Sequence, residues 1–278
     1  MATTKINGII LSESNMGDYD KMLTMLTPNF GKISCSAKGA RRPNSSLLAG
    51  TQMFCFGEYL MYKGTATYHI NSCETIEMFY KLRTDLDKLK YAIHIDKIIL
   101  DVTEENENCY NILQLLLNTL YTISESEKNL DLTLGIFKMR LLCILGFTPR
   151  VISCTNCKAK EDLKYFSIRD NGFKCENCGR QDKSAIQMSQ STLNAIKYVV
   201  TAPAKKLFSF ELKDESLEEF KLISKVYFNQ KLEKEYKLEN LFWCPIGDGS
   251  FLDIYSFQKK FQKTVEKKRN NIYNKSIS

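Results

Sequence analysis

The sequence predicts an α+β protein: a small β-barrel at the N-terminus, then a helical domain into which a four-cysteine loop is inserted. Three observations predict this order. Roughly the first 80 residues contain short segments of partly alternating apolar and polar residues. Later segments place apolar residues at i, i+3, i+4 and i+7, and two Cys-x-x-Cys pairs interrupt them. A chain of 278 residues, 44% of them hydrophobic, is long enough for about two domains.

The barrel is expected to contain several short strands separated by clusters of Gly, Pro, Asn and Ser. Strands at this spacing are typical of a small closed barrel. We place the barrel domain at residues 1–82. Strands are expected within residues 5–14, 33–42, 52–64 and 65–74.

Helical spacing of apolar residues begins after Thr84 and defines the second domain, residues 83–240. Asp214 and Glu215 suit the start of its last helix, because acidic side chains favour a helix N-terminus. The cysteine loop interrupts this domain at residues 150–184. Helices are expected within residues 86–105, 111–125, 133–147, 189–202 and 214–236.

The two cysteine pairs, Cys154 with Cys157 and Cys175 with Cys178, allow three interpretations: a redox centre, a disulfide framework or a metal site. The N-terminus lacks the basic head and apolar core of a secretion signal, and an intracellular chain keeps its thiols reduced. A redox Cys-x-x-Cys normally occurs once, beside a βαβ pattern. The separation of the two pairs is typical of a zinc ribbon.

We therefore predict a structural Zn²⁺ held by Cys154, Cys157, Cys175 and Cys178; reduced cysteines without metal remain the alternative. Four cysteine ligands leave no open coordination position, so the metal should stabilise the fold rather than act in catalysis. Gly172 and Gly179 favour tight turns beside the second pair. Nearby basic side chains are candidates to offset the thiolate charge: Lys158, Lys160, Lys174 and Arg180. The remaining cysteines are expected to be small core residues: Cys35, Cys55, Cys73, Cys109, Cys143 and Cys244.

Positive charge is concentrated at the two ends of the chain. Residues 1–50 carry 6 basic and 3 acidic groups, residues 51–250 carry 26 and 27, and residues 251–278 carry 7 and 2. In the first segment a strand is expected to end near Ala37, and Lys38, Arg41 and Arg42 follow in a turn. Such a loop suits contact with phosphate groups. An ordinary solvated turn is the alternative interpretation.

The sequence contains no recognisable catalytic motif. Its 2 histidines, His69 and His94, have no serine or cysteine partner at a known spacing, and phosphate-binding glycine loops and zinc-protease motifs do not occur. No run reaches the ~18 uninterrupted apolar residues of a membrane span. We therefore expect a cytoplasmic protein that is not an enzyme and does not bind membranes.

Three stretches carry a resemblance to a known family: AKGARRPNS at residues 37–45, LLCILGFTP at residues 141–149, and YFS with NGFKC on either side of the zinc-loop turn. Over about residues 1–238 the chain resembles the bacterial recombination mediator RecO. The resemblance implies an N-terminal OB-fold and a helical domain with a four-cysteine zinc site. The family's basic turn corresponds to Lys38, Arg41 and Arg42.

The resemblance also implies a role in DNA repair and recombination at the nucleoid. The family binds single- and double-stranded DNA, anneals complementary strands and, with RecR, helps to load RecA onto strands coated by the single-strand-binding protein SSB. The acidic, Phe-ending SSB tail contacts the family's helical domain. A basic and apolar combination is our candidate for that contact: Phe137, Lys138, Arg140 and Leu141.

Two rival functions remain from the sequence. The protein could be an adaptor for SSB and RecR with only incidental DNA binding, or part of a zinc-ribbon nuclease or ligase, although it shows no acidic metal cluster or nucleotide loop. The basic tail, residues 241–278, departs from the family pattern. Disorder with weak nucleic-acid affinity, an accessory DNA-binding segment and a partner helix are its three interpretations. The helix interpretation places four apolar residues on one face: Ile254, Phe257, Phe261 and Val265.

Overall fold

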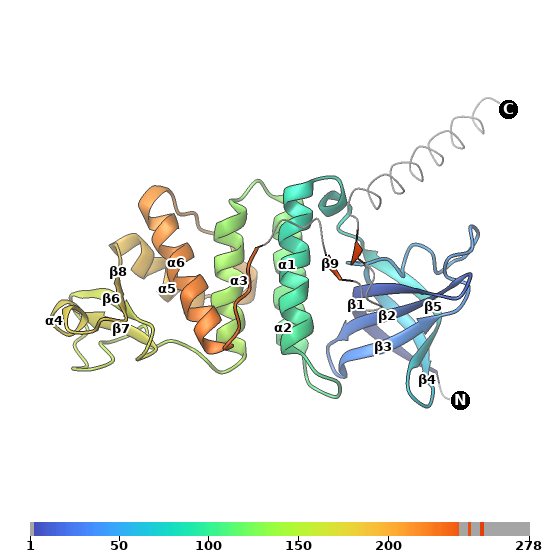
Figure 1. Cartoon of the computed structure of the whole chain (residues 1–278), viewed down its shortest axis with the longest axis horizontal. Coiled ribbons are helices and arrows are strands. Elements are labelled where there is room, and N and C mark those ends of the chain that lie inside the picture. The colour runs from blue at the N-terminus through green and yellow to red at the C-terminus, as the bar shows by residue number, and fades with distance from the viewer. Residues whose placement is uncertain (1–2, 239–243, 246–250, 253–278) are drawn as a thin grey trace, which may run out of the picture. The chain divides into compact units, whose positions relative to one another are not determined.

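The computed structural model describes residues 3–238, 244–245 and 251–252. These residues fall into two compact units (Figure 1). The barrel unit contains the chain up to Leu26 and Lys32–Met78, and the helical unit contains Thr27–Gly31 and Phe79–Lys237. The expectation for the tail, residues 241–278, lies outside the described residues except for a short antiparallel pair, β9 (Cys244–Pro245) with β10 (Phe251–Leu252).

The barrel unit is a closed five-stranded barrel with the strand order β1-β2-β3-β5-β4, as predicted for a small closed barrel. Neighbouring strands pair antiparallel where β1 meets β2 and β4 and where β4 meets β5, whereas β3 and β5 pair in parallel. The strands are β1 (Thr3–Met16), β2 (Asp20–Thr27), β3 (Gly31–Ala37), β4 (Phe56–Lys63) and β5 (Tyr68–Glu77).

Strand β2 was missing from the sequence prediction. Its alternation buries Leu23 and Met25, but Lys21 is also buried, where its ammonium group pairs with Glu13 and donates to the carbonyl of Thr51 at 3.1 Å. A buried lysine obscures the alternation in the sequence, because lysine is almost never buried unless it is paired. The last predicted strand begins three residues later than expected, since residues 64–67 form the β4–β5 turn.

Side chains from all five strands fill the barrel interior. Tyr59 lies fully buried there, and its hydroxyl donates to the carbonyl of Gly50 at 2.7 Å. Of the remaining cysteines, Cys35, Cys55 and Cys109 are buried, which confirms these three as core residues, whereas Cys73 and Cys143 are only partly buried. The expectation for the Cys244 side chain lies outside the described residues.

The helical unit contains every predicted helix. Three start at side-chain caps: Asp85 accepts from Asp87 N and Lys88 N, Asn129 from Leu132 N, and Ser189 from Thr192 N. The last helix begins at Asp214, as predicted. The α-helices are α1 (Leu86–Val102), α2 (Tyr110–Glu125), α3 (Leu130–Ile144), α5 (Gln190–Thr201) and α6 (Asp214–Lys231), with short 3-10 turns η1 (Tyr80–Arg83) and η2 (Ala204–Lys206).

Helix α3 is buried on nearly every side. At Gly135 a Cβ atom would lie 2.8 Å from the ring of Phe220, so glycine allows α6 to pack closely. None of the helices in the described ranges is both long and apolar enough to cross a membrane.

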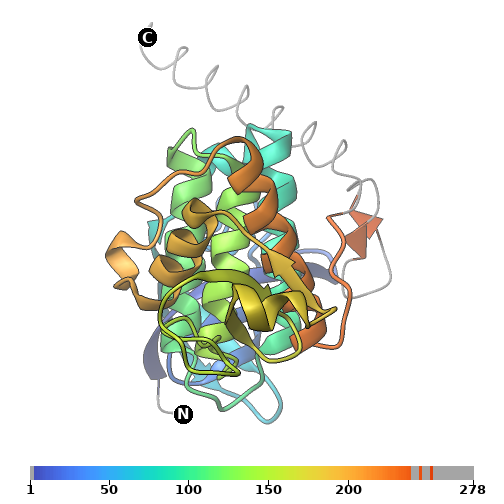
Figure 2. The same ribbon diagram turned by 90° about the vertical axis from the view of Figure 1, so that its left-hand side faces the viewer.

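Between α3 and α5 the chain forms a small three-stranded sheet with the order β7-β6-β8. A short helix, α4, follows β7 along the chain. Figure 2 views this segment from its own side of the helical unit, where it lies in front of the helices. We call residues 150–188 the cysteine module. Its elements are β6 (Leu163–Ser167), β7 (Gly172–Cys175), α4 (Glu176–Arg180) and β8 (Ala185–Gln187).

Candidate metal centre and basic loop

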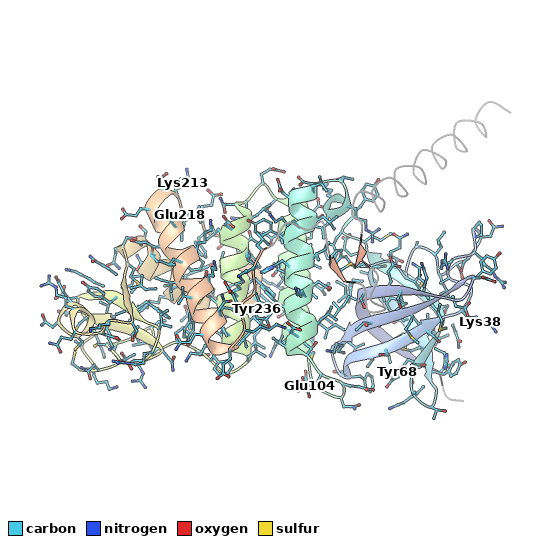
Figure 3. The ribbon with its side chains drawn as sticks, in the orientation of Figure 1. Lys38, Tyr68, Glu104, Lys213, Glu218 and Tyr236 are labelled. Atoms are coloured by element: carbon cyan, nitrogen blue, oxygen red, sulfur yellow. The ribbon has the colours of Figure 1, made fainter. Side chains whose placement is uncertain are left out.

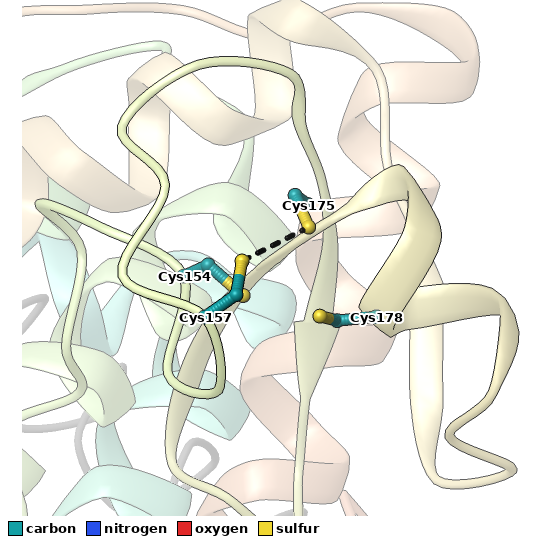
Figure 4. Close-up of side chains that lie close together, drawn as sticks. All are labelled: Cys154, Cys157, Cys175 and Cys178. Atoms are coloured by element: carbon teal, nitrogen blue, oxygen red, sulfur yellow. Dashed lines mark hydrogen bonds between the residues drawn. The ribbon is translucent and has the colours of Figure 1, made fainter.

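The cysteine module brings the four predicted ligands together (Figure 4). Cys154 and Cys157 lie on the turn before β6. Cys175 ends β7, and Cys178 lies in the first turn of α4. The first pair therefore sits on a loop, whereas the second is held by a strand end and a helix start.

The spacing of the sulfur atoms fits a tetrahedral metal ion. A Zn–S bond of about 2.3 Å places neighbouring sulfurs of a tetrahedron roughly 3.8 Å apart. The Sγ atoms of Cys157 and Cys175 are 3.6 Å apart, and all four Sγ atoms lie within 4.8 Å of one another. Four thiol ligands select thiophilic metals and disfavour Mg²⁺ or Ca²⁺. The cluster can hold one such ion.

The protonation of the thiols also depends on their packing. Burial disfavours the thiolate of Cys154, but hydrogen bonds from the backbone of Cys175, Cys157 and Asn156 lower its pKa to about 6. The backbone of Ala159 favours the Cys157 thiolate, yet the crowding thiols raise its pKa to about 11. The two thiols of the first pair thus differ in their affinity for a proton, and a divalent cation bound by all four cysteines would favour the thiolate form.

Backbone pairing fixes the first cysteine pair against β7. Thr155 N donates to the carbonyl of Phe173 at 2.8 Å, and Cys154 N donates to that of Ala159 at 2.7 Å. Gly172 has φ +156°, and a Cβ atom there would lie 2.3 Å from the carbonyl oxygen of Arg150. Only glycine fits at this position.

Gly179 has a different role from the one predicted. It lies in helix α4, outside the residues with positive φ. A Cβ atom at Gly179 would lie 2.3 Å from the ring of Tyr165, so this glycine is required by the close approach of β6 rather than by a tight turn.

A buried ion pair, Lys174 with Asp182, supports the module from inside. The Lys174 ammonium lies 2.8 Å from Asp182 Oδ2 and 2.5 Å from Asp170 Oδ2. Burial works against the Asp182 carboxylate, but hydrogen bonds from Lys174, Ser167 and Ser184 hold its pKa well below the usual range. Sequence reasoning missed Asp182, because nothing in the spacing marks its pairing with β7.

This pairing corrects part of the charge prediction. Lys174 neutralises carboxylates rather than thiolates, and Arg180 pairs with Glu176. Lys158, which follows Cys157 in the sequence, donates its ammonium to the carbonyl of Thr155 at 3.0 Å.

The basic loop, residues 38–42, follows the end of β3 in the barrel unit. Lys38, Arg41 and Arg42 are all exposed, while Ala40 between them is fully buried and anchors the loop. Figure 3 labels Lys38, which contacts no carboxylate among the described residues. Three cationic side chains thus extend into solvent from one short turn that Ala40 anchors.

The β1–β2 turn holds the basic loop in place. Asp20 accepts from Gly39 N at 2.7 Å, and Arg41 N donates to the carbonyl of Tyr19 at 2.9 Å. The Arg42 guanidinium lies over the ring of Tyr19, 5.4 Å from its centre. Gly39 adopts φ +66°, which favours glycine. Sequence reasoning missed Tyr19 and Asp20 as supports, because the contact joins residues about twenty positions apart.

The prediction of an SSB contact on α3 is wrong, because its residues do not form an exposed surface. Phe137 and Leu141 are fully buried, Lys138 is 4% exposed, and the Arg140 guanidinium donates to three carbonyls at the end of α5. These side chains pack the helices together instead.

The two histidines have structural surroundings. His69 lies opposite Ser36 across the parallel β3–β5 pair, and its Nδ1 is 2.6 Å from the serine Oγ. Sequence spacing did not reveal this contact. Its ring also stacks on Tyr62, with 4.8 Å between ring centres. His94 is buried in α1, where burial and Lys138 lower its pKa to about 3.

Comparisons with known proteins agree across both units. The family model described as Recombination protein O N terminal matches residues 1–79, and the model described as Recombination protein O C terminal matches residues 83–239.

Curated relatives match over most of their length. A protein of Acetivibrio thermocellus named DNA repair protein RecO is 41% identical over 233 residues, which cover 84% of this chain and 93% of the relative. Proteins of the same name from Alkaliphilus metalliredigens and Bacillus subtilis are each 30% identical, over 231 and 227 residues. These matches cover 83% and 82% of this chain, and 94% and 89% of the relatives. The chain belongs to the RecO family.

Proposed function

We propose that this protein is a DNA-binding mediator of repair and recombination that anneals complementary strands and has no catalytic turnover. Membership of the RecO family supports the repair and recombination role. The barrel unit supplies the DNA contact through Lys38, Arg41 and Arg42.

The basic loop is the observation that carries this proposal. Annealing needs a surface that attracts phosphate groups and leaves the base edges free to pair. A guanidinium or ammonium group contacts phosphate oxygens without reading sequence. Three such groups on a loop fixed by Asp20 and Tyr19 meet both requirements.

The cysteine module has a structural role in the same proposal. A Zn²⁺ ion bound by Cys154, Cys157, Cys175 and Cys178 would supply folding energy to a segment with little core of its own. With four protein ligands it would leave no position for a substrate.

The proposed partners follow the family. With RecR, the protein would help to load RecA onto strands coated by SSB, whose acidic tail would bind the helical unit. This work would take place in the cytoplasm at the nucleoid.

Annealing of complementary fluorescent strands, with and without SSB, tests the proposal. Wild-type protein should accelerate annealing, and a variant with Lys38→Ala, Arg41→Ala and Arg42→Ala should lose most of the acceleration. A wild-type protein that binds SSB and RecR but neither binds nor anneals DNA would support the adaptor function instead.

A further inference from the structure

A polar pocket lies beside the first cysteine pair, within the helical unit. Its volume is about 730 Å³, and it is open to solvent. It joins the loop after α3, the first cysteine turn and the β6–β7 turn. The lining residues are Thr148, Arg150, Thr155, Asn156, Asp170 and Asn171.

Arg150 is the cationic group of this pocket, and its backbone is fixed. Arg150 N donates to the carbonyl of Asn171 at 2.8 Å, and its own carbonyl accepts from Phe173 N at 2.9 Å. The residue is nevertheless exposed, and its guanidinium has no hydrogen-bond or ion-pair partner in the described part of the chain. An anchored arginine with free donors is prepared for an anionic ligand.

Further donors lie around the pocket, although two of its polar side chains are already bonded: the Thr148 hydroxyl donates to the Cys143 carbonyl, and the Asn156 amide donates to Cys178 Sγ. Thr155 Oγ1 is buried without a partner among the described residues, and buried hydroxyls normally have one. The Lys158 ammonium donates to the backbone carbonyl of Thr155 at 3.0 Å, so a second cation is held beside this lining residue. Asn171 adds an amide.

The single carboxylate in the lining is already neutralised. Asp170 Oδ1 lies 3.2 Å from Arg169 Nε, and Oδ2 lies 2.5 Å from Lys174 Nζ. It therefore does little to repel an anion at Arg150.

A second open pocket of the helical unit has a lining of opposite charge. It lies between β8 and α6 and is lined by Glu215, Glu218 and Glu219 (Glu218 is labelled in Figure 3). Three carboxylates would repel an anion, so the pocket at Arg150 is the better anion site of the two.

We propose that the pocket at Arg150 binds a phosphate group of the nucleic-acid backbone, as a second DNA contact separate from the basic loop. This inference rests on the proposed function, since it assumes that the protein binds DNA. The guanidinium would contact two phosphate oxygens, with Thr155 Oγ1 as a further donor.

The test measures binding of a fluorescein-labelled oligothymidylate by anisotropy over a range of KCl concentrations, with the full-length, metal-loaded protein. Arg150→Ala should reduce the slope of log affinity against log salt by about 0.7, the value of one single-strand phosphate contact. Arg150→Lys should retain most of the slope because it keeps the charge.

Arg180→Ala is the matched control. Arg180 is an exposed arginine of the same module, but its guanidinium already pairs with Glu176, which does not line the pocket. It should leave the slope unchanged. An equal loss in both variants would indicate a general effect of module charge and overturn the site. Metal content and thermal unfolding of each variant confirm that the module is intact.

Three further arms separate the alternatives. An unchanged slope in Arg150→Ala, with a reduced slope in the Lys38, Arg41 and Arg42 variant, would overturn the pocket and leave the proposed function standing. Loss of binding to an acidic, Phe-ending peptide without loss of DNA binding would also overturn it. Binding of inorganic phosphate that Arg150→Ala abolishes, without an effect of Arg150→Ala on DNA binding, would assign the pocket to free phosphate and overturn the DNA contact.

Discussion

The carboxylate of Asp20 accepts a hydrogen bond from the backbone N–H of Gly39 at 2.7 Å, and this bond ties the basic loop to the start of β2. Removal of the Asp20 carboxylate would leave the partly buried N–H of Gly39 without this acceptor. The position of three cationic side chains therefore depends on an acidic residue that never touches DNA in our proposal.

Replacement of Asp20 tests this dependence. Asp20→Ala should lower the free energy of unfolding by about 1–3 kcal/mol, because a hydrogen bond to a charged group is lost and a donor is left unpaired. Asp20→Asn keeps an acceptor oxygen and should lose less. Urea denaturation of both variants measures the difference, and equal stabilities would show that the bond does not hold the loop.

Removal of the metal should affect the cysteine module first. Protein purified with Zn²⁺ should carry one ion per chain, and chelation should open residues 150–188 to protease while the helices beyond them stay resistant. Limited proteolysis with mass spectrometry locates the cuts. A Cys175→Ser variant should behave like the chelated protein. Full protease resistance after complete metal loss would contradict a structural metal site.

The buried pair of Lys174 and Asp182 should show strong coupling. Lys174→Met leaves a buried carboxylate without its cation and should cost about 3–5 kcal/mol, whereas Lys174→Met with Asp182→Asn should cost less. Denaturant unfolding of both single variants and the double variant measures the coupling. Additive losses would mean that the two side chains contribute independently.

Lys138 gives a pH-dependent prediction. Burial and the nearby Lys225 lower its pKa to about 8, although Asp131 opposes the shift. The folded chain then binds fewer protons than the unfolded chain between pH ~8 and ~10.4, so stability attributable to Lys138 should rise over that window. Below it the buried ammonium is destabilising.

Lys138→Met removes that ammonium and keeps an unbranched side chain of similar length. The variant should be more stable than the wild type at pH 7, by on the order of 1–3 kcal/mol, and the difference should shrink by pH 10. Urea titrations at the two pH values measure it. A variant less stable at pH 7 would show that the ammonium makes a net stabilising contact, for example with the Phe228 ring 5.6 Å away.

The helices and the four-cysteine cluster were predictable because their signals are local. Apolar spacing places α1, α2, α3, α5 and α6, and the Cys-x-x-Cys pairs specify their own geometry. Strand β2 was not predicted because its buried Lys21 pairs with Glu13 only in the folded barrel, and the local sequence does not indicate this pairing. The supports of both candidate sites, Asp20 and Asp182, likewise depend on contacts made only after folding.

The prediction for Phe137, Lys138, Arg140 and Leu141 failed for a related reason. Basic and apolar residues side by side suggest a surface patch, but α3 is enclosed by its neighbours. The lysine stem packs among apolar residues while its charge remains inside. Sequence alone does not distinguish an enclosed helix from a half-exposed one when charged residues interrupt the apolar run.

The salt dependence of single-strand binding tests the central claim most directly. Wild-type protein and the variant with Lys38→Ala, Arg41→Ala and Arg42→Ala would be titrated with oligothymidylate over a range of KCl concentrations. Loss of three phosphate contacts should reduce the slope of log affinity against log salt by about 2. An unchanged slope and affinity would contradict DNA binding by the basic loop.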